Sequence, residues 1–187
     1  MRKGVGIPHA SKNRVAHPAK RAMVVQNYRR CATRLGLTMQ ILKQLETTRD
    51  QTLERFALRG ADLERTYGPG KWSIRYILLH LADCEAIFLH RICRVLSEPR
   101  QVLWVVDQEA WAKHLDYSRV PLELYRPLYE SARNTIIYYA NEFYEEKGHL
   151  QWVHTTAGLR TLKDEFDKVA AHNEKHLEQI RTALSFS

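Results

Sequence analysis

The chain has 187 residues, of which 44% are hydrophobic and 27% charged, and this composition suits one globular domain with an ordinary core. Its formal charge of +8 comes from residues 1–38, which hold nine Lys or Arg and no Asp or Glu, whereas residues 39–187 hold 20 basic and 21 acidic side chains. This distribution disfavours nucleic acid as a partner, because the folded part has no basic excess. No apolar stretch approaches the roughly 18 residues of a membrane span.

Residues 1–38 form a basic N-terminal extension that we expect to be disordered or loosely docked. The segment is punctuated by glycine and proline and has no sustained apolar periodicity. Its apolar run is too short for a secretory signal, which needs about 7–15 apolar residues, and its few serines disfavour a transit peptide. A nucleic-acid-binding tail and an extension upstream of a natural start at Met39 stay open. The domain is therefore expected at residues 39–187.

From Met39 to about Leu58, apolar side chains recur at the spacing of an amphipathic helix. The Gly-Pro-Gly sequence at residues 68–70 then predicts a loop. Ser73 is a suitable N-cap for a second helix, which extends to about Leu96.

A long connection is predicted over residues 97–120, with a short helix near residues 108–113. A third helix opens at Pro121 or Pro127, because proline is tolerated in the first turn. After a second connection, the last helix starts near Thr161, whose hydroxyl can form a capping pair with Asp164. We find no strand pattern. Four helices with a long crossover between the second and the third predict an all-α four-helix bundle.

Three histidines are expected to face the interior of this bundle. His172 and His176 are four residues apart on one face of the last helix, which places their side chains about 5–6 Å apart. His80 lies on a flank of the apolar face of the second helix. Three imidazoles are enough to hold a divalent metal with one coordination position open. From spacing alone, a metal site and three hydrogen-bonded core histidines are equal alternatives.

Other polar residues have competing interpretations. Cys84, one turn after His80, could be a fourth ligand, but a small buried thiol is favoured. Glu85 either orients a ligand histidine or pairs with Arg133, and we favour the pairing. We expect three histidines, His90, His114 and His149, to lie at the surface. His154 could line the mouth of a pocket, but we favour the surface for it as well. The odd count of three cysteines, at no metal-motif spacing, fits a reduced, cytoplasmic location.

A set of motifs over about residues 39–184 resembles the DinB/YfiT-like superfamily of metal-binding four-helix bundles. They occur in the family's order: residues 70–75, 80–85 and 107–111, Arg133, Gly158, residues 161–162 and residues 172–180. The resemblance implies an up-down-down-up bundle. It also implies that His80, His172 and His176 bind a divalent metal, commonly zinc or nickel.

The family's chemistry is not uniform, so the resemblance leaves several functions open. The leading expectation is a metal-dependent transferase that uses a low-molecular-weight thiol, such as bacillithiol or mycothiol, and a small electrophilic substrate. The alternatives are a metal-dependent hydrolase that uses water and a non-catalytic, metal-binding stress-response bundle. No catalytic side chain is assigned, since Glu165 is about two turns from the histidine pair. No membrane partner is expected, and a homodimer stays open.

Overall fold

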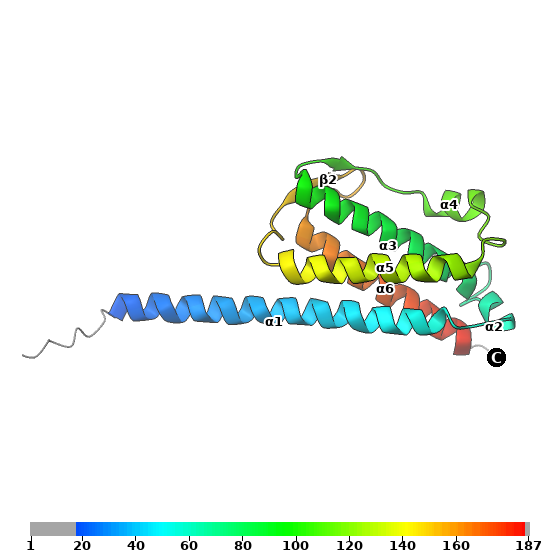
Figure 1. Cartoon of the computed structure of the whole chain (residues 1–187), viewed down its shortest axis with the longest axis horizontal. Helices are drawn as coiled ribbons and strands as arrows, with labels where there is room; N and C mark the ends of the chain where they lie inside the picture. Colours follow the sequence, from blue (N-terminus) through cyan, green and yellow to red (C-terminus); the bar gives the residue numbers. More distant parts are fainter. Residues whose placement is uncertain (1–17, 186–187) are drawn as a thin grey trace, which may run out of the picture. The chain divides into compact units, whose positions relative to one another are not determined.

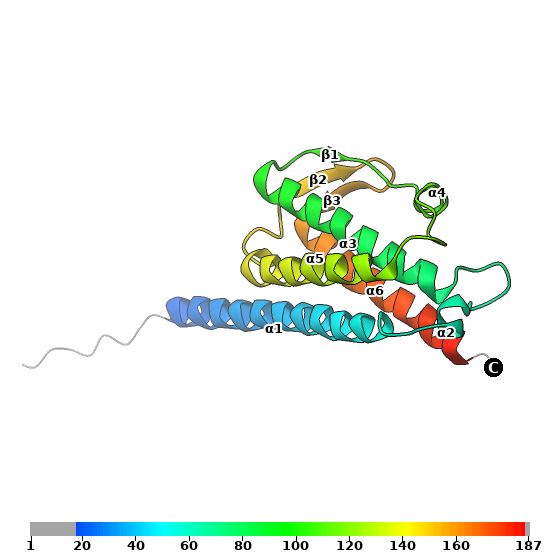
Figure 2. The ribbon, with the colours of Figure 1, turned by 45° about the vertical axis from the view of Figure 1, so that its right-hand side comes forward.

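The computed structural model describes residues 18–185, with side chains from Thr38 onward. The chain divides into two units, Met1–Leu35 and Gly36–Ser187. The second unit holds the C-terminal part of helix α1, three further long helices and a small sheet, as Figures 1 and 2 show. All of the candidate site residues belong to this unit.

Helix α1 (Pro18–Arg55) begins well before Met39, where the sequence predicted the first helix. Proline is tolerated in a first helical turn, and the residues that follow are rich in strong helix formers such as Ala, Arg, Lys and Met. Residues 18–38, which were expected to be disordered or loosely docked, are therefore helical. The rest of that extension, residues 1–17, lies outside the described residues. The domain boundary at Met39 stays a prediction.

The predicted all-α four-helix bundle is confirmed. Helices α3 (Ile74–Ser97), α5 (Leu122–Phe143) and α6 (Leu162–Ser185) pack with the C-terminal part of α1. In Figure 1, α3 and α5 run in the same direction, and α1 and α6 run in the opposite one, which gives the up-down-down-up order. Of the helices within residues 18–185, none is long and apolar enough to cross a membrane.

Local sequence signals determine where α3 and α6 begin. The Tyr76 amide donates to Ser73 Oγ at 3.4 Å. The Asp164 amide donates to Thr161 Oγ1 at 3.1 Å, while the Thr161 amide donates to Asp164 Oδ2 at 2.8 Å. This reciprocal pair satisfies two N–H groups that a helix start leaves without partners. Both predicted caps are confirmed.

The expectation of no strands was wrong. Strands β1 (Val102–Leu103), β2 (Gln151–His154) and β3 (Gly158–Thr161) form a sheet in which β1 pairs with β2 in parallel and β2 with β3 antiparallel. Strands of two to four residues are too short for a clear apolar alternation, and β1 finds its partner about 50 residues away. Two short helices complete the fold: α2 (Ala61–Glu64), which was not predicted, and α4 (Gln108–His114), which was.

An ion pair lies inside the bundle, where Glu85 of α3 and Arg133 of α5 are both 0% exposed. Arg133 Nε donates to Glu85 Oε2 at 2.9 Å, and its NH2 group donates to the other carboxylate oxygen. The NH1 group donates to Thr48 Oγ1 at 2.9 Å and to the Leu45 carbonyl at 3.2 Å, both in α1. One guanidinium therefore connects three helices, and the predicted Glu85–Arg133 pairing is confirmed.

Removing one partner of this pair should be costly. Arg133→Leu leaves the Glu85 carboxylate buried without its counter-charge, so we expect the free energy of unfolding to fall by about 3–5 kcal/mol. Arg181→Leu is the matched control, because Arg181 pairs with Glu174 and Glu178 on the exposed surface of α6 and should cost less than about 1 kcal/mol. Urea denaturation measures both values. Equal losses in the two variants would contradict a special role for the buried pair.

Candidate metal centre

The structure brings the three predicted histidines together. His80 projects from α3, and His172 and His176 project from successive turns of α6. One nitrogen from each ring can be chosen so that all three lie within 4.8 Å of one another. The Nε2 atoms of His80 and His172 are 3.2 Å apart. For ligands at about 2.05 Å from a tetrahedral ion, the expected separation is about 3.3 Å, so this pair already has a ligand-like spacing.

Burial keeps all three imidazoles neutral. It lowers the pKa of His80 to about 3, of His172 to about 2 and of His176 to about 4, with a further contribution from neighbouring positive charge. A neutral imidazole has a free lone pair on one ring nitrogen, and this is the form that binds metal. The cluster is therefore in the protonation state that a metal site requires.

Hydrogen bonds indicate which ring nitrogens are available. His176 Nδ1 lies 2.8 Å from Gln179 Oε1, an acceptor that assigns the proton to Nδ1 and leaves Nε2 free to bind an ion. A ligand histidine commonly donates its other N–H in this way. His172 Nδ1 is buried and has no hydrogen-bond partner among the described residues. Three neutral imidazoles that share so few hydrogen-bond partners suit a divalent cation better than a hydrogen-bonded core.

Aromatic rings flank the cluster on two sides. The Trp72 ring packs edge-on against His80 at 5.1 Å between centroids, and Phe88 packs against His172 at 5.3 Å. Trp72 Nε1 donates to Glu109 Oε2 at 3.3 Å, which links α4 of the crossover to the wall of the site. Sequence reasoning placed Trp72 and Glu109 only in family motifs and did not assign them to the site.

Cys84 is buried beside the cluster, as predicted for a small core thiol. Its Sγ atom lies 3.5 Å from Nε2 of His80 and 3.6 Å from Nδ1. An atom almost equally far from both ring nitrogens lies off the lone-pair direction of either one. Burial, reinforced by the nearby Glu85 and Asp83 carboxylates, raises the pKa of the thiol to about 12. In this position, Cys84 packs against a ligand candidate and does not complete the donor set.

Asn173 sets the rotation of the histidine-bearing helix. Its side chain is fully buried, and Oδ1 accepts from Thr52 Oγ1 of α1 at 3.1 Å and from the Tyr129 hydroxyl of α5 at 3.2 Å. Because Asn173 faces α1 and α5, its neighbour His172 is turned toward α3. The sequence placed Asn173 on the inner face of the last helix, but its two partners come from distant segments.

The remaining candidates divide between correct and incorrect predictions. His90, His114 and His149 are exposed, as expected. His154 is only 6% exposed, so the favoured surface position was wrong, and the side chain lines a pocket, as the alternative had it. Its Nδ1 accepts the amide hydrogens of residues 156 and 157 at 3.2 Å, a turn that draws the ring inward.

Glu165 is buried against Arg91, with an N–O distance of 3.5 Å. No hydrogen bond that the described residues form holds it toward the histidines.

Comparison with known proteins identifies the family. The sequence profile of the DinB superfamily matches residues 44–180. The chain belongs to the DinB superfamily. This DinB-superfamily chain is 30% identical over 145 residues to a protein of Oceanobacillus iheyensis named "Putative metal-dependent hydrolase OB0413", and the match covers 77% of this chain and 83% of the relative.

A second relative and a solved structure are also similar to this chain. A Halalkalibacterium halodurans protein, "Putative metal-dependent hydrolase BH0277", is 23% identical over 123 residues, which covers 66% of this chain and 71% of the relative. The structure of YfiT from Bacillus subtilis, described as "a probable metal-dependent hydrolase with an unusual four-helix bundle topology", superposes with a TM-score of 0.70 at 18% identity. That match covers 77% of this DinB-superfamily chain and 83% of YfiT, and it shows the shared fold.

The buried histidines predict how the stability of the metal-free protein depends on pH. Their folded pKa values lie below the ordinary value of 6.5, so the unfolded chain binds protons more readily than the folded one. Stability should therefore be highest above about pH 6.5 and fall as the pH drops toward 4. Urea titrations at pH 7.5 and 5.0, with chelator, measure this loss. His172→Gln should reduce this loss of stability, whereas His90→Gln, the control at an exposed histidine, should leave it unchanged. A urea midpoint that does not depend on pH would contradict the neutral state of the cluster.

Proposed function

We propose that this chain is a metal-dependent enzyme whose divalent ion, zinc or nickel, is held by His80, His172 and His176. The observation that carries the proposal is the convergence of three neutral imidazoles from two helices within 4.8 Å. No carboxylate or thiol among the described residues completes the donor group. Three protein ligands and one open position are typical of catalytic sites, whereas structural sites are usually closed by four.

The protein's own residues prepare the open coordination position. A bound divalent ion supplies Lewis acidity that lowers the pKa of a water or thiol beside it. Gln179 fixes the ring of His176, and the burial of His80 and His172 keeps both lone pairs free of protons. Trp72 and Phe88 cover the flanks with apolar surface, which limits the access of bulk water to the ring nitrogens.

A low-molecular-weight thiol is the nucleophile that this site supports best, and a small electrophile is the other substrate. A water nucleophile would be helped by a general base, but Glu165 is engaged by Arg91 and Glu85 by Arg133. Glu109, at the wall of the site, accepts from the Trp72 indole. A thiol would need no such base, because a divalent ion held by the three histidines would lower the pKa of the thiol enough for its proton to pass to solvent. The reaction class is therefore S-transfer, in which a C–S bond forms and the leaving group departs with its electron pair.

Hydrolysis is the second candidate, favoured by the names of the relatives from Oceanobacillus iheyensis and Halalkalibacterium halodurans.

A cytoplasmic location belongs to the same proposal as thiol transfer. Cys84 and Cys93 are both free thiols, as expected in a reducing compartment that also supplies small thiols.

Metal analysis tests the ligand assignment. The purified wild-type protein should bind about one equivalent of Zn²⁺ or Ni²⁺, and His80→Ala, His172→Ala and His176→Ala should each lower the affinity at least tenfold, because each removes one of three donors. His90→Ala is the control, since His90 lies on the same helix as His80 but is exposed. Metal titration by calorimetry gives the affinities. Equal affinities in the wild type and the three cluster variants would overturn the metal centre.

An activity screen separates the two reactions. The metal-loaded protein is incubated with bacillithiol, mycothiol or glutathione and an electrophilic reporter such as monochlorobimane, and in parallel with p-nitrophenyl acetate without thiol. We expect at least one thiol to be consumed faster than in the uncatalysed reaction, with the acceleration lost in His176→Ala. Ester turnover without thiol would favour hydrolysis, whereas tight metal binding without either activity would favour a non-catalytic bundle.

A further inference from the structure

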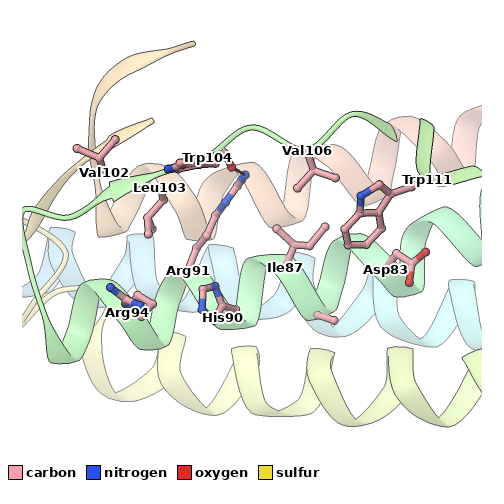
Figure 3. A pocket seen from close by; sticks show the side chains of 11 residues that line it. Asp83, Ile87, His90, Arg91, Arg94, Val102, Leu103, Trp104, Val106 and Trp111 are labelled. Carbon is pink, nitrogen blue, oxygen red and sulfur yellow. Dashed lines mark hydrogen bonds between the residues drawn. The ribbon is translucent and has the colours of Figure 1, made fainter. Parts of the chain in front are cut away.

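A cavity of about 580 Å³ lies between the outer face of α3 and the crossover that follows it (Figure 3). Its floor is the stretch of α3 from Asp83 to Arg94, and its roof runs from Val102 to Trp111. Its volume falls in the range of small-molecule sites, which is about 300–1,000 Å³. None of the three clustered histidines lines it, so it is a separate feature of the molecule.

The walls of the cavity are largely apolar and aromatic. In Figure 3, Ile87 of α3 and Val106 and Trp111 of the crossover project into the same space. Trp104, at the rim, leaves 78% of its surface exposed, and Val102 leaves 56%. Exposed apolar surface around a hollow commonly marks a binding site. An apolar ligand would remove this surface from water, which stabilises the bound state by the hydrophobic effect.

The roof is held in place by the protein itself. Arg91 NH2 donates to the Trp104 carbonyl at 2.8 Å, while NH1 pairs with Glu165 of α6 at 3.5 Å. Arg91 is only 5% exposed, so its charge is used within the structure and is not offered to a ligand. Since these two contacts join α3, the crossover and α6, they hold the roof over the floor of the cavity.

Arg94 lines one end of the cavity and uses only one edge of its guanidinium within the protein. Its NH2 group contacts Glu98 Oε2 at 3.0 Å and Gln101 Oε1 at 3.3 Å. Its Nε is buried without an acceptor, and among the described residues no hydrogen bond is formed by NH1. The carboxylate of the cavity, Asp83, is eleven residues away, about 16 Å along the helix, and accepts a hydrogen bond from Tyr117. The NH1 group of Arg94, beside the Glu98 pair, can therefore donate to an acidic group, and the middle of the cavity favours apolar groups.

We propose that this cavity binds an amphipathic organic anion, whose acidic group contacts Arg94 and whose apolar body packs against Ile87, Val106 and Trp111. The site is independent of the histidine cluster and goes beyond the proposed metal-dependent reaction. A carboxylate or sulfonate that carries a medium-length aliphatic or an aromatic group has the required chemistry.

A fluorescence titration with 1-anilinonaphthalene-8-sulfonate tests the proposal, because this aromatic sulfonate becomes brighter in an apolar site. The full chain is used in its metal-loaded form. We expect saturable binding, weakened roughly tenfold in Arg94→Gln, since a hydrogen bond to a charged group is lost. Trp104→Ala should weaken it several-fold, and its exposed position makes this variant safe for folding. Arg160→Gln is the matched control, because Arg160 is an exposed arginine outside this cavity.

Competition and a metal-site variant complete the test. Octanoate should displace the dye at a concentration about tenfold lower than octanol, which has the same chain without the charge. His176→Ala should bind the dye as the wild type does, even though its metal affinity falls. Equal dye affinity in Arg94→Gln and the wild type, equal competition by octanol, or loss of binding in a folded His176→Ala protein would each overturn the proposal and leave the metal centre untouched.

Discussion

The ion pair between Glu85 and Arg133 is the constraint on which the helix packing depends. Two charges removed from water are tolerated only when each is matched by its partner and by hydrogen bonds. Arg133 meets this condition by using all three of its nitrogens, two toward Glu85 of α3 and one toward Leu45 and Thr48 of α1. A shift of α3 or α5 along its axis would separate the two charges, and a shift of α1 would leave the NH1 group of Arg133 without its acceptors. The pair therefore specifies one register among several that apolar contacts alone would allow.

The proposed metal centre depends on the same interior order. Asn173 accepts hydrogen bonds from α1 and α5, and this contact turns the adjacent face of α6 toward α3. His172 and His176 consequently meet His80 in a place where burial keeps the rings neutral. Three uncharged imidazoles with few hydrogen-bond partners are a poor arrangement for a core and a good one for a cation. The packing that stabilises the bundle is thus also what prepares the site.

The crossover between α3 and α5 supplies side chains to two places on the bundle. DinB-superfamily membership and the likeness to YfiT establish the fold. The segment between α3 and α5 supplies Glu109 to the wall of the histidine cluster and Trp104, Val106 and Trp111 to a separate cavity. Arg91 holds this segment to both α3 and α6. Loop segments on a rigid bundle can vary without loss of the core, so ligand choice is expected to reside there.

The sequence by itself determined the bundle, its caps at Ser73 and Thr161, and the three histidines, because helical periodicity and capping are local signals. It did not determine the small sheet, since strands of two to four residues form only where distant segments meet. It also placed His154 at the surface, although a local turn draws that ring inward. Only the tertiary structure decided that His80, His172 and His176 share one point and that Arg94 borders a cavity, because both depend on which helix faces and loops pack together.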